Sequence, residues 1–160
     1  MRKQVLAISL GLLTLGSFAQ KKELKSIEKA LKNNDFTGAL TIVNSLNESI
    51  ESADDKYKSK YYFLKGQAFA GKKEYQQAAD AVNKFFDYEK KIGKERYSAE
   101  ARPRLDKLIQ AVSEKAIGLY NNDKTYKDAS KFFYLTYKLS PRDTAFAYNA
   151  AVRATQANDY

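Results

Sequence analysis

A short phrase with fixed internal spacing recurs along this chain. Its first residue is followed after three, nine, twelve and sixteen positions by further apolar or small residues. The copies run Gly66, Phe69, Tyr75, Ala78, Val82, then Ile117, Tyr120, Tyr126, Ala129, Phe133, and then Ala151, Ala154, Tyr160. From Ile117 to Ala151, and again from Tyr126 to Tyr160, the offset is 34 residues. A period of this length predicts a solenoid of small stacked units, which presents a surface and needs no reaction centre.

The composition favours helix over strand throughout. Only 7 Gly and 2 Pro occur in 160 residues, while the good helix formers Ala, Leu, Lys and Glu are common. Val and Ile are too few and too scattered to build a sheet. We therefore expect one all-α domain, an α-solenoid of helix-turn-helix repeats.

Residues 1–19 have the pattern of a cleavable secretory signal peptide. A basic start is followed by an apolar stretch over residues 5–18, and Ser17 and Ala19 supply small residues at the two positions that signal peptidase recognises. The alternative is a transmembrane anchor, but roughly 20 apolar residues are needed to span a bilayer, and this stretch is shorter. We expect cleavage after Ala19 and Sec-dependent export to the periplasm or outer envelope. No Cys follows the apolar stretch, so a lipoprotein is not expected.

The mature chain is basic, but its basic residues are dispersed. Without Arg2 and Lys3, 26 of the 28 Lys and Arg residues remain against 19 Asp and Glu, a formal charge of +7. They occur singly or in pairs among acidic residues, with no run of five or six. This is typical of a solvated helical surface and argues against nucleic acid as a partner. The alternative that the charge leaves open is an envelope-associated structural protein that binds anionic lipid or cell-wall polymer.

Residues for catalysis or metal binding are scarce. The mature chain contains no Cys, His, Trp or Met, and it has no Gly-rich phosphate loop. General acid–base catalysis and metal binding rely on His, Cys and convergent carboxylates. We therefore expect no enzyme, no cofactor and no metal site. Without a disulfide, helix packing alone must stabilise the fold.

Turn and cap residues divide the chain after residue 20 into four units, over about 21–52, 56–91, 104–141 and 144–160, the last incomplete. We expect a turn at 71–74 and a helix from Tyr75, where Ala78, Val82 and Phe85 are buried. Further helices are expected over 107–120, 126–139 and 145–157. Pro141 should end the third unit, and Asp143 should cap the last helix.

The spacing between the second and third units is longer than one repeat. The aromatic residues that open their second helices, at positions 75 and 126, are 51 apart, and the excess lies at about 89–103. Gly93 is expected to end one helix, Ser98 to cap the next, and Pro103 to start or kink it. We expect a projecting helical elbow, either a solvated connector or a docking site. It is the most basic segment, with Lys90, Lys91, Lys94, Arg96, Arg102 and Arg104.

The repeated phrase resembles the tetratricopeptide repeat (TPR), in which aromatic and small residues alternate in this way and a Pro ends the unit. The matching residues are Tyr62, Gly66, Phe69, Tyr75, Ala78 and Val82 in the second unit, Tyr120, Tyr126, Ala129, Phe133 and Pro141 in the third, and Ala147, Ala151, Ala154 and Tyr160 in the fourth. Lys65 and Ile117 depart from the pattern, because Leu and a small residue are usual there. The resemblance implies a right-handed superhelix. The leader and the richness in Lys, Asn and Tyr also resemble exported proteins of the Bacteroidetes.

The resemblance further implies a concave groove, lined by the first helix of each unit, in which a peptide or partner protein lies. The positions that the family uses for this groove are occupied by Lys60, Phe63, Gln67, Glu114, Asn121, Asn122, Tyr148 and Val152. Some members grip a C-terminal carboxylate with Lys and Asn. Here Phe63 and Gln67 stand where that clamp begins, so carboxylate capture is not expected. We expect apolar anchoring with an amide rim, and the alternative for each residue is ordinary helix surface.

The chain ends where a second helix of the fourth unit should begin. Tyr160 corresponds to Tyr75 and Tyr126, each of which is expected to open a second helix. The last helix carries several alanines along one side, whereas a terminal repeat normally shows a polar outer face. We therefore expect more repeats or another domain beyond residue 160.

Overall fold

The computed structural model describes residues 20–122 and 125–158, and every regular element in these ranges is a helix. The elements are a helix over residues 20–32, α2 (Phe36–Leu46), the 3-10 helix η1 (Ser49–Ser52), α3 (Asp55–Gly71), α4 (Tyr75–Ile92), α5 (Ser98–Asn121), α6 (Tyr126–Leu139) and α7 (Thr144–Gln156). The prediction of an all-α fold is confirmed for this part of the chain. None of its helices combines the length and the apolar character that a membrane crossing requires. The expected signal peptide and Tyr160 lie outside the described residues.

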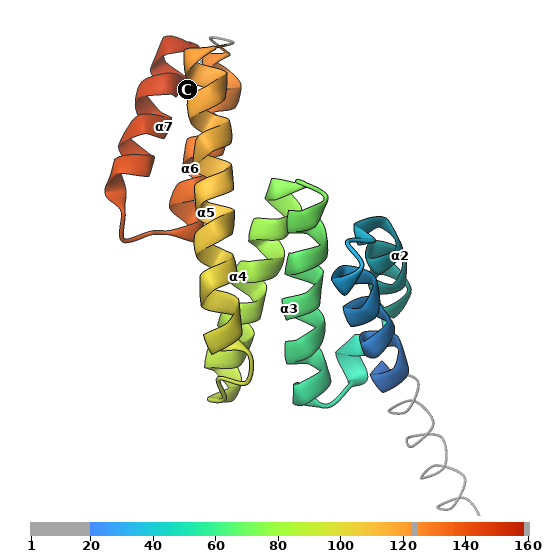
Figure 1. Cartoon of the computed structure of the whole chain (residues 1–160). Coiled ribbons are helices and arrows are strands. Elements are labelled where there is room, and N and C mark those ends of the chain that lie inside the picture. The colour runs from blue at the N-terminus through green and yellow to red at the C-terminus, as the bar shows by residue number, and fades with distance from the viewer. Residues whose placement is uncertain (1–19, 123–124, 159–160) are drawn as a thin grey trace, which may run out of the picture.

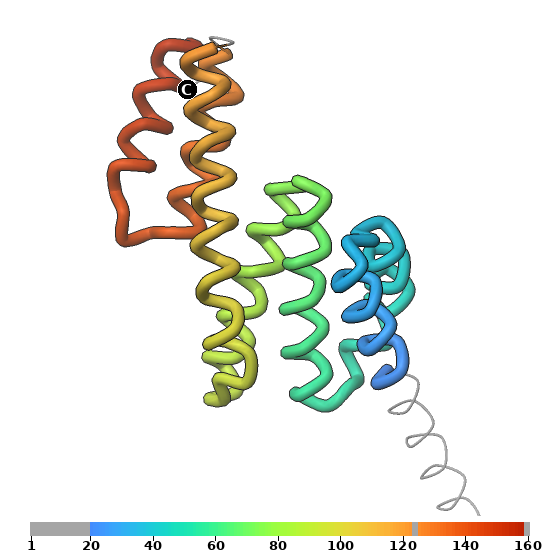
Figure 2. Tube along the Cα trace, in the orientation of Figure 1, coloured from blue at the N-terminus to red at the C-terminus, as the bar shows by residue number. Residues whose placement is uncertain are grey.

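The helices lie side by side in chain order (Figure 1). Figure 2 traces them as a row that runs from residue 20 on the right to α7 on the left. α3 packs mainly on α4, α5 on α6, and α6 on α7. The longest helix within the described residues, α5, has 24 residues, and its lower part lies near α4 while its upper part lies near α6 (Figure 1).

The turn that leads into a second helix is built in the same way three times. The residue before Phe36, Tyr75 and Tyr126 has φ of -82°, -82° and -86° and ψ of 72°, 70° and 74°. Its carbonyl accepts a 2.9 Å hydrogen bond from the amide four residues later, which in each case belongs to an alanine, Ala39, Ala78 or Ala129. The repeated sequence phrase therefore corresponds to a recurring backbone geometry.

Two of these turns also share a helix ending. Asn34 and Lys73 adopt the left-handed conformation, with φ of 56° and 60°. The next amide donates to the carbonyl five residues earlier, over 2.9 Å in the first unit and 3.0 Å in the second. This is the Schellman motif, whose left-handed position is usually Gly.

The stretch expected to form a projecting elbow is mostly helix. Residues 89–92 complete α4, and residues 98–103 begin α5, so that 93–97 alone connect them. Gly93 ends α4 in the left-handed conformation, with φ of 63°, as predicted. The prediction for Ser98 is wrong, because Tyr97 precedes the helix and Ser98 is buried inside its first turn. α5 also starts well before residue 107 and continues through Pro103.

A buried carboxylate fixes this connection against α3. Glu89 is 1% exposed, and its oxygens accept hydrogen bonds from the Ser59 hydroxyl, from the Ser98 hydroxyl at 2.7 Å and amide at 3.2 Å, and from the Tyr97 amide at 3.0 Å. Burial on its own raises the pKa of this carboxyl, but the hydrogen bonds outweigh burial and hold the pKa below its usual value. Glu89 therefore joins α3, the end of α4 and the start of α5.

The core is a series of three local clusters. The first joins the helix over residues 20–32 to α2, η1, α3, α4 and the start of α5, the second joins α4, α5 and α6, and the third joins α5, α6 and α7. Phe69 packs against the first and second clusters, and Phe132 packs against the second and third. Each cluster of the core therefore contacts the next one along the row of helices through a shared aromatic side chain.

Small residues occupy several close helix crossings, although not all that the repeat predicts. Ala78 and Ala129 are fully buried, and a Cβ on Gly66 would lie 2.9 Å from Cγ2 of Val82. Ala151, in the position of Gly66 in the last unit, is exposed. Ile117, in the same position of the third unit, is 46% exposed, while its neighbour Ala116 is fully buried.

Candidate functional site

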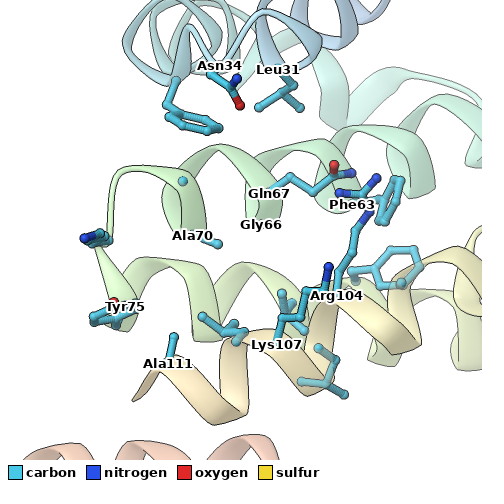
Figure 3. A pocket seen from close by; sticks show the side chains of 18 residues that line it. Leu31, Asn34, Phe63, Gly66, Gln67, Ala70, Tyr75, Arg104, Lys107 and Ala111 are labelled. Carbon is cyan, nitrogen blue, oxygen red and sulfur yellow. The ribbon is translucent and has the colours of Figure 1, made fainter. Parts of the chain in front are cut away.

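A cavity of about 430 Å³ opens between three helices that belong to different units. Its walls come from the end of the helix over residues 20–32, from α3 and from the first half of α5, with α4 contributing beneath them. Figure 3 shows Leu31 and Asn34 on one side of the cavity, Gln67 of α3 between them and α5, and Arg104 and Lys107 on the α5 side. The cavity thus spans three successive helical pairs.

The floor of the cavity is apolar. Phe63 and Phe85 are 7% and 1% exposed, and their ring centroids are 5.6 Å apart. Val82 and Leu105 extend the same surface. Gly66 adds no side chain, so it lets Val82 approach α3 closely and leaves the cavity open above it.

The rim is polar and carries one sign of charge. Lys73, Arg104 and Lys107 line the cavity, and none of the described residues that line it is acidic. The amides of Asn34 and Gln67 are the neutral hydrogen-bonding groups beside them. A cavity with an apolar floor and cationic walls favours an apolar group that carries negative charge nearby.

The three cations differ in how they are held. The Arg104 guanidinium lies 5.9 Å from the centroid of the Phe63 ring and pairs with Glu100 at 3.3 Å, at an exposed position. Such an exposed pair is worth little, about 0–1 kcal/mol, and leaves most of the Arg104 donors available. Lys73 and Lys107 are exposed and form no ion pair with any residue that the structure describes.

Two of the predicted groove residues, Phe63 and Gln67, line this cavity. Lys60 lies one turn before Phe63 on α3 and does not line it. Its ammonium pairs with the Glu28 carboxylate at 2.8 Å, with side chains that are 22% and 37% exposed. Lys60 therefore ties α3 to the helix over residues 20–32 next to the cavity.

The other predicted groove residues lie elsewhere. Glu114 is exposed on α5, and Asn121 and Asn122 are exposed at the end of that helix. Tyr148 is 70% exposed on α7, and Val152 on the same helix is half-buried. In Figure 1, α7 lies at the left end of the row, separated from α3 by α4, α5 and α6, so the structure does not bring Tyr148 and Val152 together with Phe63 and Gln67.

Sequence reasoning missed the contribution of α5 to the site. Arg104 was expected in a basic elbow and Lys107 at the start of a helix, yet both lie well inside α5. The sequence did contain a signal. Residues three apart share a helix face, and Arg104 and Lys107 each directly precede an apolar residue, Leu105 and Leu108. The missing information was the early start of α5, which turns this face towards α3.

Titratable groups with a shifted pKa lie outside the cavity. Burial raises the pKa of Tyr61 to about 12, and burial together with a hydrogen bond to Glu51 raises the pKa of Tyr62 to about 12. Their hydroxyls donate to the Val43 carbonyl at 3.2 Å and to the Glu51 carboxylate at 2.9 Å. These phenols therefore stabilise the packing of the first two units. Within the ranges described, the acidic side chains form no group that could hold a metal ion.

Comparison of the chain with protein-family models, with curated proteins and with solved structures finds no match. The chemistry of the cavity itself is therefore the basis on which a function can be argued.

Proposed function

We propose that this chain is a non-enzymatic binding module of the cell envelope, a TPR-like solenoid that holds a peptide or a segment of a partner protein in its groove. The observation that carries the proposal is the cavity of about 430 Å³ between three helical pairs, with its apolar floor and polar rim. Grooves that accept extended or helical peptides combine apolar pockets with a polar edge in this way.

The solenoid arrangement is supported by two features of the backbone and core. The turn before Phe36, Tyr75 and Tyr126 has the same geometry each time, and the core clusters are linked in series through Phe69 and Phe132. Stacked repeats pack on their neighbours in this manner and line a continuous face with equivalent helices. Peptide binding on that face is therefore a natural use of the architecture.

A peptide-display selection on the purified protein tests this function. The matched variants are Gln67→Trp, which places a bulky ring inside the cavity, and Gln77→Trp, which places the same ring on the exposed side of α4. We expect selected peptides to bind wild type and Gln77→Trp alike and to bind Gln67→Trp at least about tenfold more weakly, a loss of about 1.4 kcal/mol. Circular dichroism would establish that both variants remain helical. Equal binding to all three proteins, or no selected peptide, would contradict the proposal.

A second candidate function rests on the basic turn between α4 and α5. Lys90, Lys91, Lys94 and Arg96 are exposed there, and such a cluster attracts anionic surfaces at low salt. This would make the chain an envelope-associated structural protein that binds anionic lipid or cell-wall polymer. Sedimentation with anionic vesicles and with cell-wall sacculi tests it, using a variant with these residues changed to Gln. Absence of binding by wild type at low salt removes this function.

Export is part of the proposal. The pattern of residues 1–19 supports cleavage after Ala19. Mass spectrometry of the protein from a cell-envelope fraction should find a mature chain that begins at Gln20. A chain in that fraction that still begins at Met1 would contradict cleavage.

A further inference from the structure

We propose that the cavity selects an internal stretch of acidic polypeptide that carries one bulky apolar side chain. This inference rests on the proposed peptide-binding function and names the class of ligand. Its basis is the combination of a floor made by Phe63, Val82 and Phe85 with a rim made by Lys73, Arg104 and Lys107.

The size of the cavity limits what enters it. About 430 Å³ lies in the lower part of the range of ligand pockets, which is about 300–1,000 Å³. This volume accommodates a large side chain with its adjoining backbone and excludes a folded domain. The floor gives such a side chain an apolar contact, and the amides of Asn34 and Gln67 are available to the peptide backbone.

The charge of the rim decides which residues accompany the apolar one. Three cations line the cavity without an acidic lining residue. A Lys or Arg in the ligand would face like charge, whereas Asp or Glu would face opposite charge on more than one side. Because the cations are solvent-exposed, the attraction should weaken with added salt. Acidic residues on both sides of the apolar anchor therefore fit this rim.

Because the three cations are spread along the cavity, they favour a ligand with several acidic side chains over a ligand with a single terminal carboxylate. Arg104 lies beside Phe63 at one end of the cavity, and Tyr75 lies at the other end (Figure 3). Lys73, two residues before Tyr75, extends the positive charge towards that end. A single terminal carboxylate can meet only one of these positions, whereas an internal segment with several Asp or Glu residues can meet all of them.

The decisive experiment measures binding of synthetic decapeptides that are acetylated at the N-terminus and amidated at the C-terminus. The central residue is Leu, Phe or Gly, and the flanking residues are Glu, Gln or Lys. We expect the protein to bind most tightly the peptides in which Leu or Phe is flanked by Glu. Replacement of the central residue by Gly, or of Glu by Gln, should each weaken binding about tenfold or more. Affinity should also fall as salt is raised.

Two charge-reversal variants on the same helix test whether the preference for acidic peptides arises at the cavity. Lys107 lines the cavity and Lys115 does not, and both are exposed on α5. We expect Lys107→Glu to weaken the Glu-flanked peptide at least about tenfold and to remove most of the salt dependence, while Lys115→Glu leaves both unchanged. Equal effects of the two reversals would overturn the proposal.

The outcomes separate this inference from the proposed function. If peptides bind at a site that Gln67→Trp blocks but prefer Gln or Lys flanks, the acidic specificity is wrong and peptide binding stands. If the same decapeptides bind only when they are made with a free C-terminal carboxylate instead of the amide, the internal segment is wrong and peptide binding stands. If no peptide of any class binds, or if Gln67→Trp has no effect, the proposed function fails together with this inference.

Discussion

Glu89 and Lys73 occupy positions that are unfavourable for their residue types when each is considered alone. A carboxylate that is 1% exposed loses its hydration, and a Lys with φ of 60° takes a conformation that Gly adopts more readily. Glu89 is compensated by donors from Ser59, Tyr97 and Ser98. The left-handed turn at Lys73 is compensated in part by the 3.0 Å hydrogen bond from the Glu74 amide to the Phe69 carbonyl, and the Lys73 side chain lines the cavity.

Replacement of Glu89 by Gln should destabilise the protein. Gln offers one acceptor oxygen where the carboxylate accepts at least four hydrogen bonds, so donors are left unsatisfied, at a cost of roughly 1–3 kcal/mol. Urea denaturation at neutral pH measures this difference. The exposed Glu114→Gln serves as control and should change stability by less than about 0.5 kcal/mol.

The difference in stability between wild type and Glu89→Gln should depend on pH. Because the folded pKa of Glu89 is lower than its unfolded pKa, its contribution is fully present above the unfolded value and is lost as pH falls through the folded value. The stability gap between wild type and Glu89→Gln should therefore be constant near neutral pH and narrow below about pH 4.3, the ordinary pKa of Glu. A gap that widens on acidification would contradict this account of Glu89.

Replacement of Lys73 by Gly should raise the stability of the fold but weaken peptide binding. Relief of the left-handed conformation should stabilise the fold by up to about 1 kcal/mol, while the loss of the charge weakens the acidic peptide. The neighbouring Lys72 has φ of -78°, so Lys72→Gly should instead lower stability slightly and leave binding intact. Thermal melts and peptide titrations measure both properties. Equal changes in the two variants would show that the backbone conformation of Lys73 is unimportant.

At the scale of helices, packing depends on small residues at close crossings. Ala129 at the start of α6 is fully buried, and Ala151 on α7 is exposed. Inserting a larger side chain at a closely packed helix crossing typically costs about 1–3 kcal/mol of folding stability, whereas a substitution at an exposed position has little effect. We therefore expect a larger side chain to cost roughly 1–3 kcal/mol more at Ala129 than at Ala151.

The test at this scale compares Ala129→Leu with Ala151→Leu. The first should lower the melting temperature by several degrees, because about 1 kcal/mol corresponds to roughly 2–4 °C for a chain of this size. The second should leave it within about 2 °C of wild type. If Leu is tolerated equally at both positions, the packing described for α6 is incorrect.

Sequence patterns located the elements better than the site. Tyr75 and Tyr126 open helices as predicted, and Asp143 caps α7 through a 3.1 Å hydrogen bond from the Ala145 amide. These features are local, because caps and turns depend on neighbouring residues. The start of α5 depends instead on Glu89 reaching Ser98 and Tyr97 across a connection, which no periodicity records.

The site was predicted in part for the same reason. Phe63 and Gln67 occupy groove positions that the resemblance to the tetratricopeptide repeat implies, and both line the cavity. Arg104 and Lys107 could not be assigned, because their helix face is turned towards α3 by the packing of α5. Ile117 shows a further limit: it occupies the phrase position of Gly66, yet its neighbour Ala116 takes the buried role.

At the scale of the molecule, neighbouring clusters of the core are joined by side chains that pack against both. The cooperativity of unfolding should therefore depend on these shared residues. Phe69 contacts two clusters, whereas Phe146 contacts the third alone. Both side chains are half-buried. Removal of a shared ring should therefore loosen the coupling between parts as well as lower stability.

We expect Phe69→Ala and Phe146→Ala to cost up to roughly 3 kcal/mol each. Phe69→Ala should also make α2 and α3 exchange their amide hydrogens at a different free energy from α5 and α6, and it should lower the urea m-value. Phe146→Ala should leave the m-value unchanged, and faster exchange should be confined to α7 and its contacts. Identical exchange patterns in both variants would contradict coupling through Phe69.

The walls of the cavity belong to three successive helical pairs, so its width depends on how these pairs pack against one another and not on any single helix. A slight rotation of one pair against the next would widen or narrow the opening while every helix stayed intact. Substitutions between the pairs, outside the cavity itself, would then change the size of its opening. An occupant that touches all three pairs would lock them at one angle and stiffen the whole row.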